Sequence, residues 1–106
     1  MSRIVIAAFR PKPERAHDLL RVVQRHHAVL AEQGLVTERP RIVMQAADGT
    51  LVEVFEWASA EAIDRAHTNP AVRELWEAFA AACDYVPIGE VAEARQLFSE
   101  FAPVNA

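Results

Sequence analysis

Cysteine is nearly absent from this chain, because Cys83 is the only one among 106 residues. A single cysteine excludes an internal disulfide and is typical of a reducing compartment. Basic residues are also few, with 11 Lys and Arg against 15 Asp and Glu, which gives a formal net charge of -4. Such a surface repels polyanions, so we expect neither nucleic acid nor an anionic membrane as a partner.

Long apolar runs are missing as well. The first apolar run, Ile4 to Phe9, ends at Arg10 and is too short for a signal peptide or a membrane span. We therefore expect a cytoplasmic protein. Hydrophobic residues still make up 52% of the chain, which is enough for a core. The length is that of one ordinary domain, so residues 1–106 are expected to form a single domain.

The spacings that usually hold a metal ion are absent too. The chain contains no HExxH and no CxxC sequence. His26 and His27 are adjacent, and on a helix adjacent side chains point about 100° apart, so the pair cannot chelate one ion. The sequence therefore predicts no metal site.

The hydrophobic pattern predicts the element order β-α-β-β-α-β. The apolar run from Arg3 to Phe9 indicates a strand covered on both faces. Pro13 opens a long helix that continues to about Gln33, and Gly34 stops it. The remaining expected elements are strands at Pro40–Ala47 and Thr50–Trp57, helices at Ala60–His67 and from Pro70 through Cys83, a helical turn near Glu90–Ala94, and a last strand near Gln96–Ala102.

The Asp48-Gly49 pair lies between two apolar strands and predicts a hairpin with a two-residue turn. That turn would place Met44 opposite Glu53 and Arg41 opposite Glu56. One face of the hairpin would then carry Ile42, Met44, Ala46, Leu51, Glu53, Phe55 and Trp57, and the other would carry Val43, Gln45, Val52 and Val54.

Both faces of this hairpin are largely apolar, yet two helices cover only one face of a four-stranded antiparallel sheet. An uncovered apolar face implies a partner. We therefore expect a homodimer formed through the sheet, with Val43, Val52 and Val54 inside the interface.

The segment from Trp57 to Ala62, followed by Ala66-His67 and Asn69-Pro70-Ala71-Val72, resembles the antibiotic-biosynthesis-monooxygenase-like family of the dimeric α+β barrel superfamily. The resemblance covers nearly the whole chain, including the first strand, the hairpin and the helix through Trp76 and Phe79. It implies a ferredoxin-like α+β fold and a dimer. That superfamily includes cofactor-free quinone-forming monooxygenases, haem-degrading enzymes and isomerases.

The haem-degrading branch of the superfamily does not match this chain. Ala66 stands where that branch needs a tryptophan, and Trp76 stands where it needs the histidine that binds haem iron. The first strand also lacks the asparagine that this branch uses. We therefore expect neither haem nor any other cofactor.

Three titratable residues are candidates for acid–base chemistry. His27 lies on the apolar stripe of the first helix, so it is either a core histidine or a base facing a pocket. Glu53, on an apolar face, is either paired or an acid with a raised pKa, and a contact with His27 would satisfy both groups. His67 either interacts favourably with the dipole of its helix or, as the resemblance implies, lines the mouth of the pocket.

Five aromatic residues are expected to contribute mainly to the core and also to suit a flat ligand: Phe55, Trp57, Trp76, Phe79 and Tyr85. We predict a pocket between the sheet and the helices that binds a small aromatic ligand. The preferred hypothesis is a metal- and flavin-free monooxygenase acting on a small phenolic compound. A non-catalytic ligand-binding dimer and an isomerase of a small carbonyl compound are the alternatives.

Overall fold

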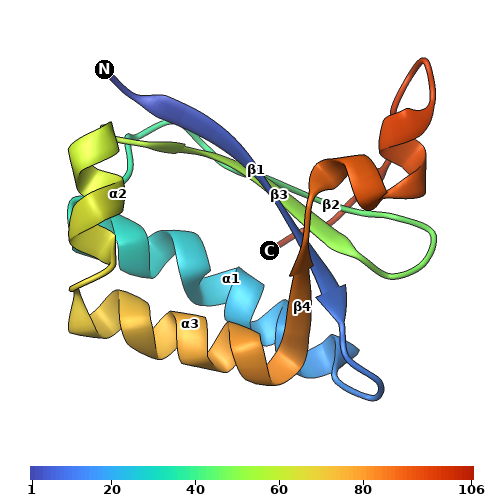
Figure 1. Cartoon of the computed structure of the whole chain (residues 1–106), viewed down its shortest axis with the longest axis horizontal. Coiled ribbons are helices and arrows are strands. Elements are labelled where there is room, and N and C mark those ends of the chain that lie inside the picture. Colours follow the sequence, from blue (N-terminus) through green and yellow to red (C-terminus); the bar gives the residue numbers. More distant parts are fainter.

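The computed structural model describes residues 1–106 as one antiparallel sheet with helices on one side. The first three strands are β1 (Arg3–Pro11), β2 (Ile42–Gln45) and β3 (Leu51–Trp57). The other two are β4 (Cys83–Val86) and β5 (Ala102–Pro103), and the order across the sheet is β4-β1-β3-β2-β5. Helices α1 (Ala16–Glu32) and α3 (Pro70–Ala82) lie side by side against the sheet, and α2 (Ala60–Ala66) lies at one end (Figure 1). The ferredoxin-like α+β fold predicted from the sequence is confirmed.

The helix ends follow the local signals in the sequence. Ser59 accepts a hydrogen bond from the backbone N–H of Ala62 at 3.0 Å and caps α2. Asn69 does the same for α3, where Pro70 occupies the first helical position. Helix α1 ends before Gly34, whose φ of 69° lets the chain turn back without a side-chain clash. No helix of the structure is long and apolar enough to cross a membrane.

The hairpin between β2 and β3 differs from the prediction by one residue. The backbone N–H of Ala46 donates to the carbonyl of Thr50 at 2.9 Å, so the loop has three residues, Ala47 to Gly49. Gly49 has a φ of 93°, as the last residue of such a loop requires. The register therefore pairs Val43, not Met44, with Glu53. Because side chains alternate along a strand, this shift moves Val43 to the helix-covered face and turns Ile42 and Met44 away from it.

The fourth strand also differs from the prediction. Cys83 begins β4 immediately after α3, whereas the sequence pattern placed it on the helix. Residues 96–101 contain no strand, although the prediction placed the last strand there. That segment forms a protruding arm, and β5 follows it to pair with the edge of β2 (Figure 1). Pro87 lies directly after β4, and this position explains why the element is only four residues long.

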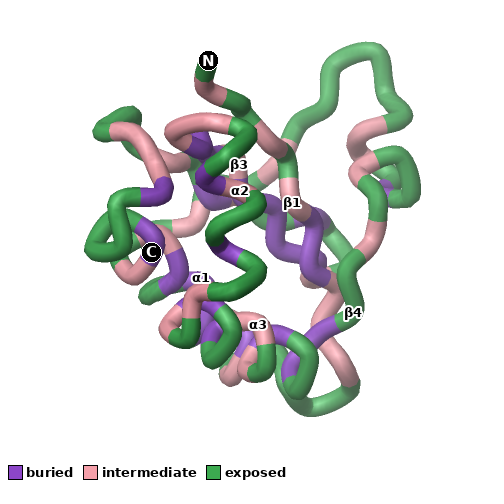
Figure 2. Tube along the Cα trace, turned by 60° about the vertical axis from the view of Figure 1, so that its left-hand side comes forward, coloured by how far each residue is buried: buried purple, intermediate pink, exposed green.

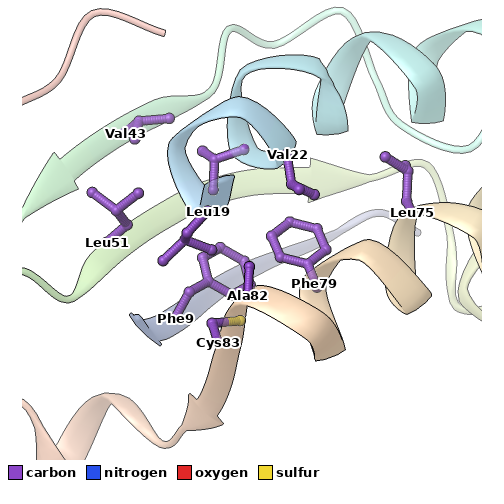
Figure 3. Packing of buried hydrophobic residues seen from close by; sticks show 10 residues of the cluster. Phe9, Leu19, Val22, Val43, Leu51, Leu75, Phe79, Ala82 and Cys83 are labelled. Atoms are coloured by element: carbon purple, nitrogen blue, oxygen red, sulfur yellow. The ribbon is translucent and has the colours of Figure 1, made fainter. Parts of the chain in front are cut away.

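The main core fills the space between the sheet and the two long helices. Figure 3 shows Leu19 and Val22 of α1 and Phe79 of α3 pointing toward the side chains of the strands. Phe9 of β1 stacks on Phe79 with a centroid distance of 4.6 Å. Complete burial of such a side chain stabilises the fold by roughly 2 kcal/mol, so this layer holds the helices on the sheet.

The opposite face of the sheet is only partly covered. The C-terminal segment places Val91 over Ala8, Ala46 and Val52, which are buried there. Ile4, Ile6 and Ile42 remain more than half exposed on the same face. In Figure 2 the buried parts of the strands lie toward the helices, and the C-terminal arm is exposed. The face expected from sequence to form an interface thus needs correction, because Val43 lies under the helices and Val52 is covered within the chain.

Candidate functional site

A cavity of about 400 Å³ lies between the sheet and the helices. Its walls include the five aromatic residues that the sequence placed there: Phe55, Trp57, Trp76, Phe79 and Tyr85. Three residues of β1 complete the apolar lining: Val5, Ala7 and Phe9. Tyr85 is 55% exposed, so the cavity opens to solvent along the edge formed by β4. A volume of this size suits a small organic molecule.

The one lining residue that is not hydrophobic is His26. Helix α1 buries Leu19, Val22, Val23, His26 and Leu30, so His26 occupies the stripe position that the prediction gave to His27. Neighbouring residues on a helix differ by about 100°, and the apolar spacing of α1 fits either stripe. Of the two adjacent histidines, His26 and not His27 therefore faces the sheet.

The His26 ring is fixed from several sides. Its centroid lies 5.0 Å from that of Phe79 and 5.4 Å from that of Phe55, and both contacts are edge-to-face. Its Nδ1 lies 2.6 Å from Oε1 of Glu53. This contact replaces the Glu53–His27 contact that the sequence suggested. Edge-to-face packing and one short hydrogen bond leave the imidazole little freedom to rotate.

Glu53 has no solvent exposure and lies behind His26, outside the cavity wall. Burial opposes ionisation of this carboxyl, but its pKa is nevertheless lowered because hydrogen bonds with His26 and Arg41, together with nearby positive charge, outweigh burial. Arg41 donates from Nη1 to Oε2 at 2.8 Å. Glu53 is therefore an ionised hydrogen-bond acceptor, and not the acid with a raised pKa that the sequence left open.

The ionised state of Glu53 decides the tautomer of His26. A carboxylate can only accept hydrogen bonds, so Nδ1 of His26 must carry the proton in their contact. In the neutral imidazole, the free lone pair then lies on the second nitrogen, Nε2. His26 is also the one residue of the cavity wall that is not hydrophobic, so its imidazole is the candidate base for a ligand there.

Arg41 does not pair with Glu56, contrary to the predicted register. Glu56 accepts hydrogen bonds from Thr37 at 2.6 Å, from Ser2 at 2.8 Å and from Arg39 at 3.1 Å. These bonds, led by the one from Thr37, lower the pKa of Glu56 to about 2. The pair is separated because Glu56 points to the face opposite the helices, whereas Arg41 reaches Glu53 beneath them.

The other two candidate histidines lie outside the cavity wall. His27 packs near Phe55, and its Nε2 is buried without a hydrogen-bond partner. Burial, helped by the charge of Arg41, lowers the pKa of His27. His67 is exposed at the end of α2, where Nδ1 contacts the carbonyl of Ile63 at 2.9 Å and the ring packs on Trp76. Neither histidine is placed to contact a ligand in the cavity.

Sequence reasoning missed His26, Arg41 and the β1 wall. The β1 wall had a usable signal, because Val5, Ala7 and Phe9 alternate along one strand and must share a face. For His26 and Arg41 the signal was ambiguous, since each assignment depends on a helix rotation or a strand register that one residue can shift.

Comparison with known proteins identifies a shared fold. No family model matches the chain, and no curated protein matches it. The crystal structure of SnoaB, a cofactor-independent oxygenase from Streptomyces nogalater, matches with a TM-score of 0.68 and 17% identity over 80% of this chain and 86% of that one. A conserved protein from Methanosarcina mazei Go1 matches with a TM-score of 0.58 and 19% identity, over 79% of this chain and 83% of that one. The chain therefore has the α+β fold of SnoaB, as its resemblance to the antibiotic-biosynthesis-monooxygenase-like family predicted.

Proposed function

We propose that this protein is a cofactor-independent monooxygenase that oxidises a small phenolic aromatic compound in the cavity between the sheet and the helices. The observation that carries the proposal is the cavity wall, which is aromatic and aliphatic except for one histidine. The fold shared with SnoaB, described as a cofactor-independent oxygenase, supports the same reaction class.

We infer that His26 carries out the first step. A phenol lying flat between the aromatic walls would present its hydroxyl to Nε2, which accepts the proton. The anion of an electron-rich phenol or hydroquinone can then react with dioxygen directly. Glu53 stabilises the imidazolium that forms, since its carboxylate already accepts the Nδ1 proton at 2.6 Å.

The overall reaction balances without a further reductant. A phenol with a hydrogen at the para carbon reacts with one dioxygen molecule to give a quinone and water. One oxygen atom enters the ring carbon, and the other leaves with the phenolic and para hydrogens. Dioxygen is reduced by the four electrons that the substrate loses. The protein contributes a base, stacking surfaces and shelter from bulk water.

Oxygen consumption by the purified protein tests the proposal. A panel of one- to three-ring phenols would be incubated in air-saturated buffer, and ¹⁸O₂ would show whether one labelled oxygen enters the product. His26→Gln should reduce turnover by about 100-fold or more, as loss of a general base does. His17→Gln is the matched control, because His17 is exposed on the same helix and lies outside the cavity.

The same panel separates catalysis from binding. Phenols that raise the melting temperature without oxygen uptake would indicate a ligand-binding domain and refute the oxygenase assignment. Turnover that is unaffected in His26→Gln would refute the role of His26. Equal turnover rates in His26→Gln and His17→Gln would also refute the role of His26.

A further inference from the structure

Arg41 lies between helix α1 and the buried carboxylate of Glu53. It precedes β2, and its side chain is only 12% exposed. Nη1 donates to Oε2 of Glu53 at 2.8 Å and also to the backbone carbonyl of Val23. Nη2 donates to the carbonyl of Gln24 at 3.1 Å. The guanidinium is thereby held by α1 on one side and by the buried carboxylate on the other.

A continuous polar chain follows from these contacts. The cavity borders His26, His26 contacts Oε1 of Glu53, and Arg41 binds Oε2 of the same carboxylate. Each oxygen of Glu53 is occupied by a different partner. Arg41 does not line the cavity, so it can affect chemistry there only through Glu53 or through its contacts with α1.

We propose that Arg41 is a positioning residue that keeps His26 in its basic form by neutralising Glu53 from behind. The expected effect of Arg41 on turnover rests on the proposed function, whereas its effect on the protonation of His26 does not. The buried carboxylate of Glu53 contacts both His26 and Arg41, and of these two only Arg41 is permanently charged.

The physical reason is a competition for one proton. A buried carboxylate beside a histidine, with no other cation, favours uptake of a proton by the pair. The proton would either make His26 an imidazolium or protonate Glu53. The guanidinium of Arg41, bound to Oε2 of Glu53, already balances the buried negative charge. Proton uptake by the His26–Glu53 pair is therefore less favourable. Nε2 of His26 then stays unprotonated and can accept a proton from a substrate.

The remaining titratable groups around His26 do not supply a positive charge that could neutralise Glu53. His27, the next residue on α1, has a pKa lowered by burial. On β4, burial raises the pKa of Cys83 to about 11 and that of Tyr85 to about 12, so both are neutral near pH 7. The cavity residues from β1 and α3 are hydrophobic. Arg41 is thus the cation that faces Glu53.

Nuclear magnetic resonance titration of the ligand-free protein tests the inference directly. In the wild type, ¹⁵N shifts of the His26 ring should show a proton on Nδ1 and none on Nε2 near pH 7. In Arg41→Met the midpoint at which the His26–Glu53 pair takes up a proton should move to higher pH by about one unit or more. In Glu53→Gln the midpoint should move to lower pH, because the anion is gone.

Arg41→Lys is the matched control, since it keeps the charge and removes the fork of donors. Its midpoint should stay within about half a pH unit of the wild-type midpoint. A purely structural role for Arg41 would give no such dependence on charge. Three outcomes would overturn the inference. The first is an unchanged midpoint in Arg41→Met, and the second is an equal shift of the midpoint in Arg41→Met and Arg41→Lys. The third is a proton on Nε2 of His26 in the wild type near pH 7. The wild-type tautomer and the lysine and glutamine variants decide the question if Arg41→Met does not fold.

The kinetic measurement distinguishes this inference from the proposed function. The acid limb of the profile of kcat/KM against pH should move in Arg41→Met by the same amount and in the same direction as the NMR midpoint. If the wild type consumes no oxygen with any phenol, the proposed function fails. The NMR titration still decides whether Arg41 sets the protonation of His26.

Discussion

Glu53 joins the hydrophobic core to the polar chemistry of the cavity. It has no solvent exposure, and both of its oxygens accept hydrogen bonds. A buried carboxylate without partners would take up a proton, and here His26 and Arg41 prevent that. The same contacts hold β3, α1 and the residue before β2 together, so one side chain serves stability and chemistry at once.

Loss of Glu53 should therefore destabilise the fold strongly. Glu53→Leu leaves a buried guanidinium and imidazole without their acceptor, and we expect the free energy of unfolding to fall by about 3–5 kcal/mol. Urea denaturation measures this change. Glu61→Leu, on the exposed side of α2, is the control and should change stability by about 0.5 kcal/mol or less. A loss below about 1 kcal/mol in Glu53→Leu would show that the buried network contributes little.

His27 should make stability depend on pH. Its pKa is lowered from the ordinary value of 6.5 by burial first and by Arg41 second. As pH falls below 6.5, His27 consequently binds a proton in the unfolded chain but stays neutral in the folded chain. The contribution of His27 is fully present above pH 6.5 and is lost progressively as pH falls toward the folded pKa.

Unfolding experiments between pH 7.5 and pH 5 check this dependence. His27→Gln should flatten the decline in stability across that window, and His17→Gln, an exposed change on the same helix, should leave it intact. Glu53 and Glu56 act at lower pH, because their lowered pKa values confine their loss of stability to the range below the ordinary carboxyl value of 4.5. An equally steep decline in His27→Gln would contradict the assignment.

At the scale of secondary structure elements, the hairpin turn decides which side chains reach the cavity layer. A three-residue loop ending at Gly49 puts Val43 opposite Glu53 and leaves Arg41 on the same face. A two-residue loop would shift the partner strand by one residue and turn Arg41 toward the opposite face. The buried network thus depends on a backbone detail at the far end of the hairpin.

Gly49→Ala should destabilise the hairpin through its backbone. The φ of 93° at Gly49 is unfavourable for a residue with a Cβ atom, and the nearest atom to that Cβ, Cγ of Pro11, lies at an ordinary 3.8 Å. We expect a loss of about 1–2 kcal/mol in thermal or urea unfolding. Gly89→Ala is the matched control, because its added Cβ meets nothing within 4 Å and its φ is not positive. Equal effects in both variants would exclude the conformational explanation.

At the scale of the whole molecule, the face of the sheet opposite the helices is unevenly covered. The C-terminal segment shields Val52 and Ala46, while Ile4, Ile6 and Ile42 stay exposed together. The expectation of a homodimer through the sheet now rests on these isoleucines and on half-buried Val54, rather than on Val43 and Val52. A second copy of the same apolar surface is the complementary partner that we propose.

The dimer proposal predicts a twofold mass in solution. Light scattering after size exclusion should report about twice 11.8 kDa for the wild type. Ile6→Asp should shift the population toward monomer, because the interface would bury an unpaired charge. Ala28→Asp, an exposed change on α1 away from this face, should leave the mass unchanged. A wild-type mass of one chain would refute the proposal.

Features that depend only on neighbouring residues could be predicted from the sequence. Ser59, Asn69-Pro70 and Gly34 set helix ends, because capping and backbone conformation act within a few positions. The aromatic character of the cavity was also predictable, since Phe55 and Trp57 alternate on one strand.

Features that depend on how the helices and strands pack together could not be predicted from local sequence. The choice between His26 and His27 depends on the rotation of α1 against the sheet. The pairing of Arg41 with Glu53 rather than Glu56 depends on the register of the hairpin. The position of β4 depends on the edge of β1 that accepts it. Local propensities leave such one-residue alternatives nearly equal. Packing of the core selects between them, because the observed register places Val43 under the helices and pairs the buried Glu53 with Arg41.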